Sequence, residues 1–418
     1  MRENQWVEKY LKGDKVIWLI LFFLSMASIL IVYSTVGALA YRQLGGNTWY
    51  YFWKQMSFTL GGFLVVGLLV NYARGFMNFL RYLALPLLIV SVLLVIVALV
   101  YGRHAASGRT IPLGILTFQP AEVVKITLAL FVSSVLCKNQ GSRHELRRAF
   151  FISMIATCVT CALIFFADFS TSVIIFASVL VILWVGRVPW IFLAGTIGTM
   201  ILFCTLIYFA VELSPDKIGK VGRLATVHNR IERFVSSNDA MEQERQKAFK
   251  FTQADYAKMA IANGGFLFGQ GIGDSKYANL MSAAYNDFVY AIFLEEYGGL
   301  FGIFILLLFF ILLTRGGVII RSSKRVFPAF LTAGLVFQLV FQAMINMGVA
   351  VGLLPVTGQP LPWVSMGGSS RLLTAAAFGL ILCASVLARE DNALEKGMNK
   401  ESELDSAKNY VDEDAEMV

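Results

Sequence analysis

A small number of charged side chains lie inside long apolar segments of this chain, where they could do chemistry. Glu122 and Lys125 follow closely behind Gln119 and Pro120. On a helix, residues three apart share one face and can form an ion pair. An ionisable residue at mid-membrane depth costs about 2.5–3.5 kcal/mol on insertion scales, so it marks a functional site by default. Two interpretations remain: the pair lines a polar substrate cavity, or it only pins two helices together.

Further carboxylates lie at the ends of apolar segments or within them. Asp168 stands at the end of one such segment, where it could cap a helix, lie at a solvated edge or face a cavity. Glu295 and Glu296 are adjacent, and successive helical residues differ by about 100° in direction, so both cannot face lipid. We expect one or both to face the interior of a helix bundle.

Asp287 lies where a long polar stretch enters an apolar segment, between Asn286 and Phe288. A carboxylate at a membrane surface, under a large loop, could act as a general base. An acidic residue in the first turn of a helix also commonly stabilises the helix dipole. The residue types alone leave both roles open.

The sequence offers little for metal or redox chemistry by cysteine and histidine. Five cysteines fall in or beside apolar segments, and the chain has three histidines. Cys158 and Cys161 form a C-x-x-C, but with so few other ligands they are better explained as small packing residues than as a zinc or redox site.

Membrane helices must position these residues. The chain of 418 residues is 57% hydrophobic and 15% charged, with a mean hydropathy of +0.68, whereas soluble domains are about a quarter charged. A bilayer core needs roughly 20 apolar residues per helix. We therefore predict an all-α, polytopic membrane protein with about ten transmembrane helices. The predicted spans are residues 16–36, 53–71, 79–101, 118–137, 149–167, 170–186, 189–212, 287–313, 327–350 and 371–388.

Positive charges indicate the orientation of these spans. With the N-terminus in the cytoplasm, the inner loops collect most of the lysines and arginines, as the positive-inside rule requires. Both termini are therefore predicted to be cytoplasmic. The net charge of +8 is carried largely by short loops between apolar spans. Such charge favours lipid headgroups and anionic lipid-linked substrates as partners, and not nucleic acid.

Two outer segments are unusual. Residues 213–286, between the seventh and eighth spans, are too long for a simple connector. Their periodic pattern predicts an amphipathic helix over residues 239–263 that ends at a run of glycines. Residues 351–370 are rich in Gly and Pro yet apolar, and such backbone is tolerated at membrane depth only where protein covers it or it lines a cavity.

The chain divides into three parts. Residues 1–15 form a cytoplasmic segment, and residues 16–388 form the transmembrane domain. Residues 389–418 form an acidic tail with ten acidic and four basic residues. We predict that this tail is disordered, and that its charge is either solvated or used for docking.

Several motifs recur in a known family. Gly352 to Gly358 read G-L-L-P-V-T-G, the sequence Pro360-Leu361-Pro362 follows, and Ser365 to Ser370 read S-M-G-G-S-S. Upstream, Gln119 to Lys125 read Q-P-A-E-V-V-K, and Asp287-Phe288 precede Glu295-Glu296-Tyr297-Gly298. These motifs resemble the SEDS family of FtsW, RodA and SpoVE, over nearly the whole chain.

The resemblance implies a ten-helix glycosyltransferase that polymerises lipid II outside the cytoplasmic membrane. It implies that Asp287 is the catalytic carboxylate, which takes the proton of the acceptor sugar's 4-hydroxyl while undecaprenyl pyrophosphate leaves. A divalent cation, Mg²⁺ or Mn²⁺, held at Asp287 is compatible with this chemistry. The substrate-binding residues that the resemblance implies are Arg109, Gln119, Glu122, Lys125, Asp168, Arg230, Arg233, Gln253, Glu295, Glu296, Ser365, Ser369 and Ser370.

The resemblance also implies partners. The family works with a single-pass class B penicillin-binding protein, which is a transpeptidase, and with other cell-division proteins. The long charged outer loop and the charged tail favour the FtsW branch, which serves division at the septum, over the RodA branch, which serves elongation.

The chain departs from the family pattern before Asp287. Residues 282–286 read S-A-A-Y-N where the family often has P-E-A-H-T, so no helper role for a histidine is carried over. Two other functions stay open: a transporter that flips lipid II, and a non-enzymatic scaffold that activates a transpeptidase. A flippase needs no base at the outer surface, and a scaffold needs no carboxylates inside the membrane.

Overall fold

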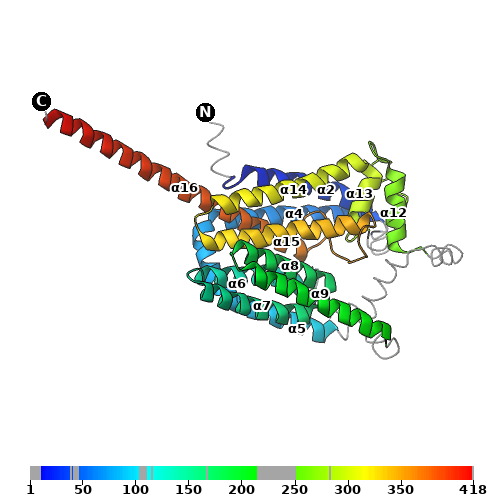
Figure 1. The fold of residues 1–418 in the computed structure, drawn as a ribbon. Coiled ribbons are helices and arrows are strands. Elements are labelled where there is room, and N and C mark those ends of the chain that lie inside the picture. The colour runs from blue at the N-terminus through cyan, green and yellow to red at the C-terminus, as the bar shows by residue number, and fades with distance from the viewer. Residues whose placement is uncertain are drawn as a thin grey trace.

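The computed structural model describes residues 11–37, 40, 47–102, 111–113, 116–165, 168–213, 251–281 and 284–416. These residues form a bundle of long helices that run roughly side by side (Figure 1). The long apolar helices are α2 (Lys15–Thr35), α4 (Thr48–Asn71), α5 (Ala73–Gly102), α6 (Pro120–Lys138), α7 (Arg143–Phe165), α8 (Phe169–Val185), α9 (Trp190–Leu213), α14 (Gly299–Ser322), α15 (Val326–Ala350) and α16 (Ser369–Glu416). In the described part of the chain, eight helices are long and apolar enough to cross a membrane. The shorter apolar α8 and the apolar first part of α9 bring the number to the ten predicted.

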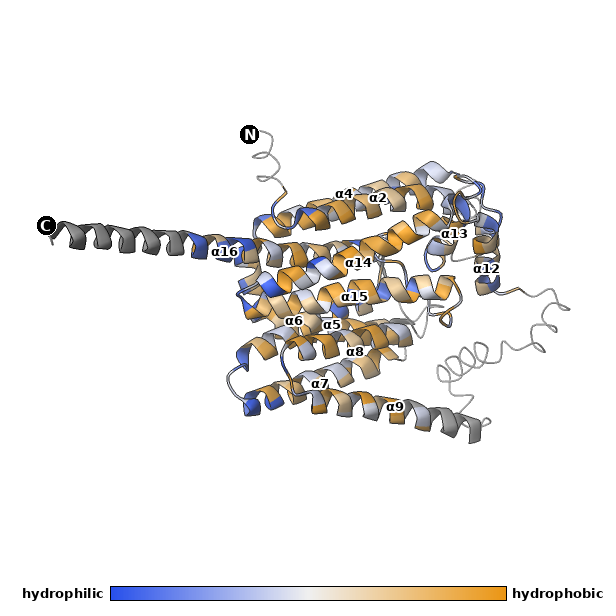
Figure 2. Ribbon diagram, turned by 45° about the horizontal axis from the view of Figure 1, so that its top comes forward, coloured by the Kyte–Doolittle hydropathy of each residue, from blue (hydrophilic) through white to orange (hydrophobic). Residues whose placement is uncertain are grey.

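Hydropathy separates an interior from a lipid-facing exterior. α6, α15 and the part of α16 up to Lys396 are mostly buried, whereas α4, α5 and α14 expose broad apolar faces. Hydrophobic residues predominate along the helices of the bundle (Figure 2). Within the bundle α16 packs along α4, and α15 packs along both α8 and α14. A helix that is apolar all round is expected in this setting, because lipid covers the sides that protein does not. The chain is a multi-pass membrane protein.

Both ends of the described chain lie at one end of the bundle. Gly13, just before α2, packs against Leu382 and Val386 of α16. Asp14 caps α2 by accepting the Val16 N–H at 2.9 Å. Its other carboxylate oxygen accepts from Arg315 Nε of α14 at 2.9 Å. α9 and α15, which precede the two long outer segments predicted from the sequence, end at the opposite end of the bundle (Figure 1).

The acidic tail was predicted to be disordered, and in the structure its residues up to Glu416 belong to α16. α16 continues without interruption to Glu416 (Figure 1). Extending an existing helix adds hydrogen bonds without the cost of nucleation. The sequence beyond Arg389 contains no proline and a single glycine, so nothing in it stops the helix.

The eighth predicted span, residues 287–313, consists of two helices instead of one. α13 (Val289–Tyr297) and α14 meet at Gly298, whose φ is +87°. This backbone conformation is accessible almost only to glycine. The break leaves backbone groups that need hydrogen-bond partners, since irregular backbone at membrane depth must be satisfied by protein.

A glycine-rich segment from the outer loop fills this break. It follows α12 (Gln253–Gly264), the described part of the amphipathic helix predicted over residues 239–263. Gly299 N–H donates to the Gly265 carbonyl at 3.1 Å, and Leu300 N–H donates to the Phe266 carbonyl at 2.9 Å. α12 ends at glycine, as predicted, and its first turn is closed by a capping box from Thr252.

Two small elements were not predicted. β1 (Ile111–Leu113) and β2 (Leu116–Phe118) pair antiparallel, with Pro112 opposite Thr117, directly before α6. A single 3₁₀ turn, η1 (Ala278–Leu280), precedes the segment that carries Asp287. Elements of three residues are too short to give a periodic signal in a sequence.

Candidate active site

The Gly- and Pro-rich segment between α15 and α16 folds back into the bundle. Gln359, Leu361 and Ser365 of this segment are buried. Side chains of α15 hold its backbone: Asn346 Nδ2 donates to the Gln359 carbonyl at 2.7 Å, and Gln342 Nε2 donates to the Pro360 carbonyl at 2.9 Å. Protein therefore covers this irregular backbone, as predicted from its composition.

The same segment, between α15 and α16, forms hydrogen bonds with the backbone just before Asp287. Ser365 Oγ donates to the Asn286 carbonyl at 2.7 Å, and Met366 N–H donates to the Tyr285 carbonyl at 3.1 Å. Asn346 Nδ2 also donates to the carbonyl of Asp287 at 2.9 Å. Asp287 is thus held from two sides on a half-buried turn just before α13.

The Asp287 carboxylate affects its surroundings electrostatically. Burial, and after it the negative charge of Asp287, raises the pKa of the Tyr285 phenol above its usual value. The Tyr285 phenol therefore ionises less readily than that of a free tyrosine, and it can donate or accept a hydrogen bond next to Asp287.

A cavity of about 250 Å³ opens beside Asp287. It lies between the start of α6, the turn before α13 and the segment that leads into α16. Several residues predicted to bind substrate line it together with Asp287, namely Gln119, Ser365, Ser369 and Ser370. Residues that are far apart in the sequence therefore meet at one site, at the end of the bundle opposite the termini.

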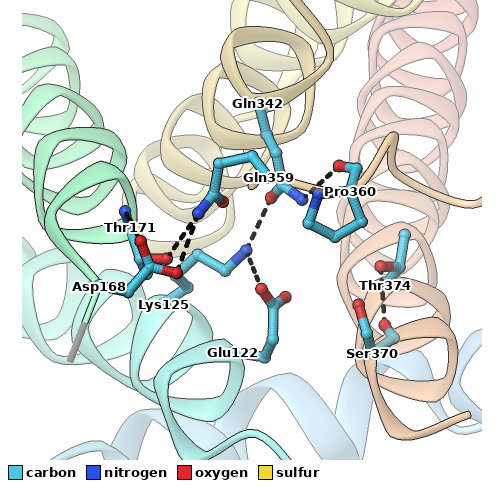
Figure 3. Close-up of polar contacts among 9 residues, drawn as sticks. All are labelled: Glu122, Lys125, Asp168, Thr171, Gln342, Gln359, Pro360, Ser370 and Thr374. Carbon is cyan, nitrogen blue, oxygen red and sulfur yellow. Dashed lines mark hydrogen bonds and ion pairs between the residues drawn. The ribbon is translucent and has the colours of Figure 1, made fainter. Parts of the chain in front are cut away.

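Glu122 and Lys125 lie beneath this site instead of in its wall. Their side chains are each 5% exposed, and Lys125 Nζ lies 2.7 Å from Glu122 Oε1. Lys125 Nζ also donates to Gln342 Oε1 at 2.7 Å, and the Gln342 amide reaches the Pro360 carbonyl (Figure 3). The pair is therefore connected to the cavity through Pro360, which lines it.

Asp168 has one of the roles considered for it, that of a helix cap. It is 3% exposed and forms the N-cap of α8, where it accepts the Thr171 N–H at 3.4 Å. Gln359 Nε2 donates to its other carboxylate oxygen at 3.1 Å (Figure 3). Asp168 is a helix cap that also holds the segment before α16, and it does not line the cavity.

Glu295 and Glu296 are both buried, which confirms the prediction that at least one faces the interior. Neither lines the cavity. Glu295 accepts from Asn263 Nδ2 at 2.9 Å and from the Lys276 N–H at 3.1 Å, and Glu296 accepts from Ser34. Their carboxylates organise the glycine-rich segment after α12. Gln253, the first residue of α12, likewise lies away from the cavity.

The sequence interpretation missed Arg371 and Trp363. Arg371 lines the cavity and is 2% exposed, and its guanidinium lies 5.7 Å from the Trp363 ring centre. Trp363 has a φ of +66°, a strained conformation for a bulky residue. The rule that flagged Glu122 would also have found Arg371, an ionisable residue at the start of an apolar span.

The remaining predictions on site residues concern other parts of the chain or a metal. Arg109, Arg230 and Arg233 lie outside the described residues. Across the described ranges, no three His, Cys, Asp or Glu side chains gather where they could hold a metal ion. A divalent cation at Asp287 would therefore take most of its ligands from substrate or water.

Comparisons with known proteins agree with this architecture. A family model described as a cell cycle protein, and named for FtsW, RodA and SpoVE, matches residues 14–390. The chain is 29% identical over 392 residues to the probable peptidoglycan glycosyltransferase FtsW of Bacillus subtilis, with 89% of this chain and 92% of that protein covered. It is 30% identical over 365 residues to the protein of the same name from Nitrosomonas europaea, with 85% and 88% covered.

A solved structure shares the fold. The chain superposes with a TM-score of 0.67 on a chain from a peptidoglycan synthase complex in which polymerization and crosslinking are coordinated. The two are 24% identical, and the match covers 90% of this chain and 98% of the other.

Proposed function

Because this chain belongs to the FtsW/RodA/SpoVE family of cell cycle proteins, we propose that it is a peptidoglycan glycosyltransferase that polymerises lipid II. One observation carries the proposal: Asp287 lines a cavity at the end of the bundle opposite both termini. With both termini in the cytoplasm, as the loop charges predict, this cavity faces the outer side of the cytoplasmic membrane. A lipid-linked sugar is available there once it has been flipped.

Asp287 acts as the general base in this proposal. Its carboxylate takes the proton from the 4-hydroxyl of the acceptor sugar. The hydroxyl oxygen forms a bond to the anomeric carbon of the donor, and the bond from that carbon to undecaprenyl pyrophosphate breaks with inversion. The hydrogen bonds to the backbone of Asn286 and Asp287 fix the position of the base before substrate arrives, which is the preorganisation that such catalysis needs.

The Glu122–Lys125 pair has a supporting role. Lys125 already forms an ion pair with Glu122 and a hydrogen bond to Gln342, so it is poorly placed to stabilise a leaving group. The pair instead supports the segment around Pro360 from below. We assign it to positioning, because its charges cancel locally and its hydrogen bonds end at cavity backbone.

The partner is a single-pass class B penicillin-binding protein. The structural neighbour comes from a complex that coordinates polymerization with crosslinking, and a chain that only polymerises glycan needs a transpeptidase beside it. The resemblance to FtsW supports a role for the pair at the division septum.

The test is polymerisation of lipid II by purified Asp287→Asn protein with its partner, with products separated on a gel. Asparagine keeps the shape of aspartate but cannot accept the proton, so we expect at least a ~100-fold loss of rate. Asp274→Asn is the matched control, because Asp274 is an exposed carboxylate of the same outer region that does not line the cavity. Near wild-type polymerisation by Asp287→Asn would remove the catalytic assignment and favour a lipid II flippase or a scaffold.

A further inference from the structure

The cavity wall contains a buried cation that the mechanism above does not use. The Arg371 guanidinium donates to the hydroxyls of Ser28 and Thr59 and to the carbonyl of Trp363. With the Gln55 amide turned so that its oxygen faces the guanidinium, that oxygen accepts from Arg371 at 2.8 and 3.1 Å. All of these partners are neutral. Within the described ranges Arg371 forms no ion pair with a carboxylate.

A guanidinium in this setting is incompletely compensated. Its Nε is buried and has no hydrogen-bond partner among the described residues. Burying a charge is costly unless it is both hydrogen-bonded and paired with an opposite charge. Arg371 also lines the cavity. Its Nη groups are already bonded to Ser28, Thr59 and Trp363, so an anion in the cavity would compensate the charge electrostatically.

The same wall of the cavity is the N-terminus of a long helix. Gly367 and Gly368 line the cavity, and Ser369 and Ser370 begin α16, which runs for 48 residues. The N–H groups of a helix's first turn have no partner within the helix, and the helix dipole makes this end partly positive. Glycine-rich turns that lead into helix N-termini bind phosphate in unrelated folds for these reasons.

We propose that Arg371 and the first turn of α16 bind the phosphate groups of the lipid-linked substrate. This inference rests on the proposed function, because the pyrophosphate must lie near the bond that breaks, and Asp287 lines the same cavity. The cavity volume of about 250 Å³ suits a group of this size. Pockets that enclose whole drug-sized ligands are larger, at roughly 300–1,000 Å³, so the sugars and the lipid extend beyond it.

The variant Ser370→Asp distinguishes a phosphate-binding role of the first turn of α16 from a purely structural role. An acidic residue in the first turn stabilises a helix, so a structural role predicts an unchanged or raised Tm and normal ligand binding. A phosphate site predicts repulsion of the ligand, because Ser370 lines the cavity. Asn47→Asp is the matched control: Asn47 is the exposed N-cap of α4, where it accepts the Tyr50 N–H at 3.4 Å.

The measurement is equilibrium binding to the purified full-length chain. The probes are undecaprenyl pyrophosphate, undecaprenol, which lacks phosphate, and inorganic pyrophosphate. We expect Ser370→Asp and Arg371→Gln to reduce the affinity for undecaprenyl pyrophosphate at least ~10-fold, since hydrogen bonds to charged groups are stronger than those between neutral groups. Binding of undecaprenol should not change in either variant, and Asn47→Asp should bind all three probes like the wild type.

The probes also identify the source of the phosphate. Undecaprenyl pyrophosphate bound at least ~10-fold more tightly than inorganic pyrophosphate supports a lipid headgroup. Equal affinities that are both reduced by Ser370→Asp support a site for the free anion. Wild-type affinity of the Ser370→Asp protein for undecaprenyl pyrophosphate overturns the proposal.

The proposed glycosyltransferase activity can be tested independently of the phosphate site. Asp287→Asn should bind undecaprenyl pyrophosphate at least as tightly as the wild type, since it removes a negative charge from the cavity, while it no longer polymerises lipid II. A wild-type protein that binds this lipid but makes no glycan refutes the enzyme and leaves the phosphate site standing. A wild-type protein that polymerises while Ser370→Asp binds normally refutes the phosphate site alone.

Discussion

Glu122 and Lys125 share a hydrogen-bonded chain with the cavity, although neither lines it. Lys125 reaches Gln342 at 2.7 Å, and Gln342 holds the carbonyl of Pro360 at 2.9 Å. Removing one charge therefore has two effects that must be separated. It leaves the other charge buried without compensation, and it loosens the segment that carries the cavity wall.

Glu122→Gln should reduce polymerisation and also lower stability. Breaking a buried pair by removing one partner costs about 3–5 kcal/mol, because the remaining charge is uncompensated. The double variant Glu122→Gln/Lys125→Met removes both charges, so we expect much of the stability to return. Activity should stay low in the double variant, because the bond to Gln342 is lost as well. The readouts are Tm in detergent and polymerisation of lipid II.

The positioning role would be refuted if the single variant inserts normally and keeps full activity. If the double variant recovers both Tm and activity, the pair only pins helices together, which was the other interpretation of its spacing.

From the sequence, several residues that line the cavity could be predicted, but the residues that contact them in space could not. Asp287, Gln119 and the serines before and at the start of α16 could be found because polar residues at membrane depth are expensive and the motifs resemble a family. The partners of Arg371 could not be found. Ser28 lies 343 residues away and Thr59 lies 312 residues away, so only the packing of α2 and α4 against α16 brings them together.

Among the elements, the break between α13 and α14 depends on glycines that leave no room for a side chain. A Cβ on Gly269 would lie 2.1 Å from the carbonyl carbon of Glu296. Near this contact the backbone is joined by bonds from Gln270 N–H to the Glu295 carbonyl at 2.9 Å and from Gly271 N–H to the Glu296 carbonyl at 3.1 Å. The outer segment is thus fastened to the membrane helix at the point where that helix is interrupted.

Gly269→Ala should lower the Tm and reduce polymerisation. The added methyl group meets backbone, which cannot rotate away, and overpacking of this kind costs about 1–3 kcal/mol. Gly67→Ala is the control, because Gly67 lies within α4, one turn before its end, and a Cβ there would meet no atom of another element within 4 Å. Alanine favours helix over glycine, so the control should be neutral or slightly stabilising. An unchanged Tm in Gly269→Ala would show that the outer segment is not held as tightly as these contacts imply.

The helices were easier to predict than the interruption. The second and last spans were predicted to start at residues 53 and 371, and the corresponding helices begin at Thr48 and Ser369. These starts could be predicted to within a few residues because long apolar runs with polar flanks define the spans. The run from 287 to 313 shows the same apolar pattern on both sides of Gly298. Its break is satisfied by backbone groups about 30 residues earlier in the chain, and such pairing leaves no periodic trace in the sequence.

For the whole molecule, ion pairs hold α16 where it leaves the bundle. Arg325 binds Asp391 through Nε at 2.9 Å and Nη2 at 2.8 Å, and Arg74 Nη2 lies 2.9 Å from Glu390. Asn392 Nδ2 also donates to the Ser322 carbonyl at 3.1 Å. These contacts all precede residue 397, so a chain shortened to residue 396 keeps every one of them.

Deletion of residues 397–418 should therefore leave insertion, Tm and polymerisation of the purified protein unchanged. Deletion of residues 390–418 removes the ion pairs as well. Because exposed pairs contribute only about 0–1 kcal/mol each, we expect a small decrease in Tm from this longer deletion. Loss of polymerisation after the shorter deletion would mean that the tail takes part in the reaction.

The exposed apolar surface of α14 indicates where a membrane partner packs. Leu300 and Leu307 of α14 are 52% and 50% exposed, and Phe268 of the outer segment is 85% exposed. The two surfaces are continuous, because Leu300 N–H is bonded to the carbonyl of Phe266. Lipid can cover α14, but apolar side chains that continue beyond it toward the outer end are better covered by a protein. A single-pass transpeptidase, with one helix and an outer domain, matches both parts of this surface.

A photo-crosslinking side chain at Leu307 should therefore capture the transpeptidase in native membranes. The same group at Leu93 of α5 is the control, since Leu93 is 55% exposed on a different apolar helix. An adduct at Leu307 and none at Leu93, read by mass on a gel and by peptide sequencing, is the expected result. Equal adducts at both positions would indicate collisions in the membrane instead of a bound partner. Repeated purification of the chain alone at high activity would contradict the requirement for a partner, because the exposed surface would then serve only to contact lipid.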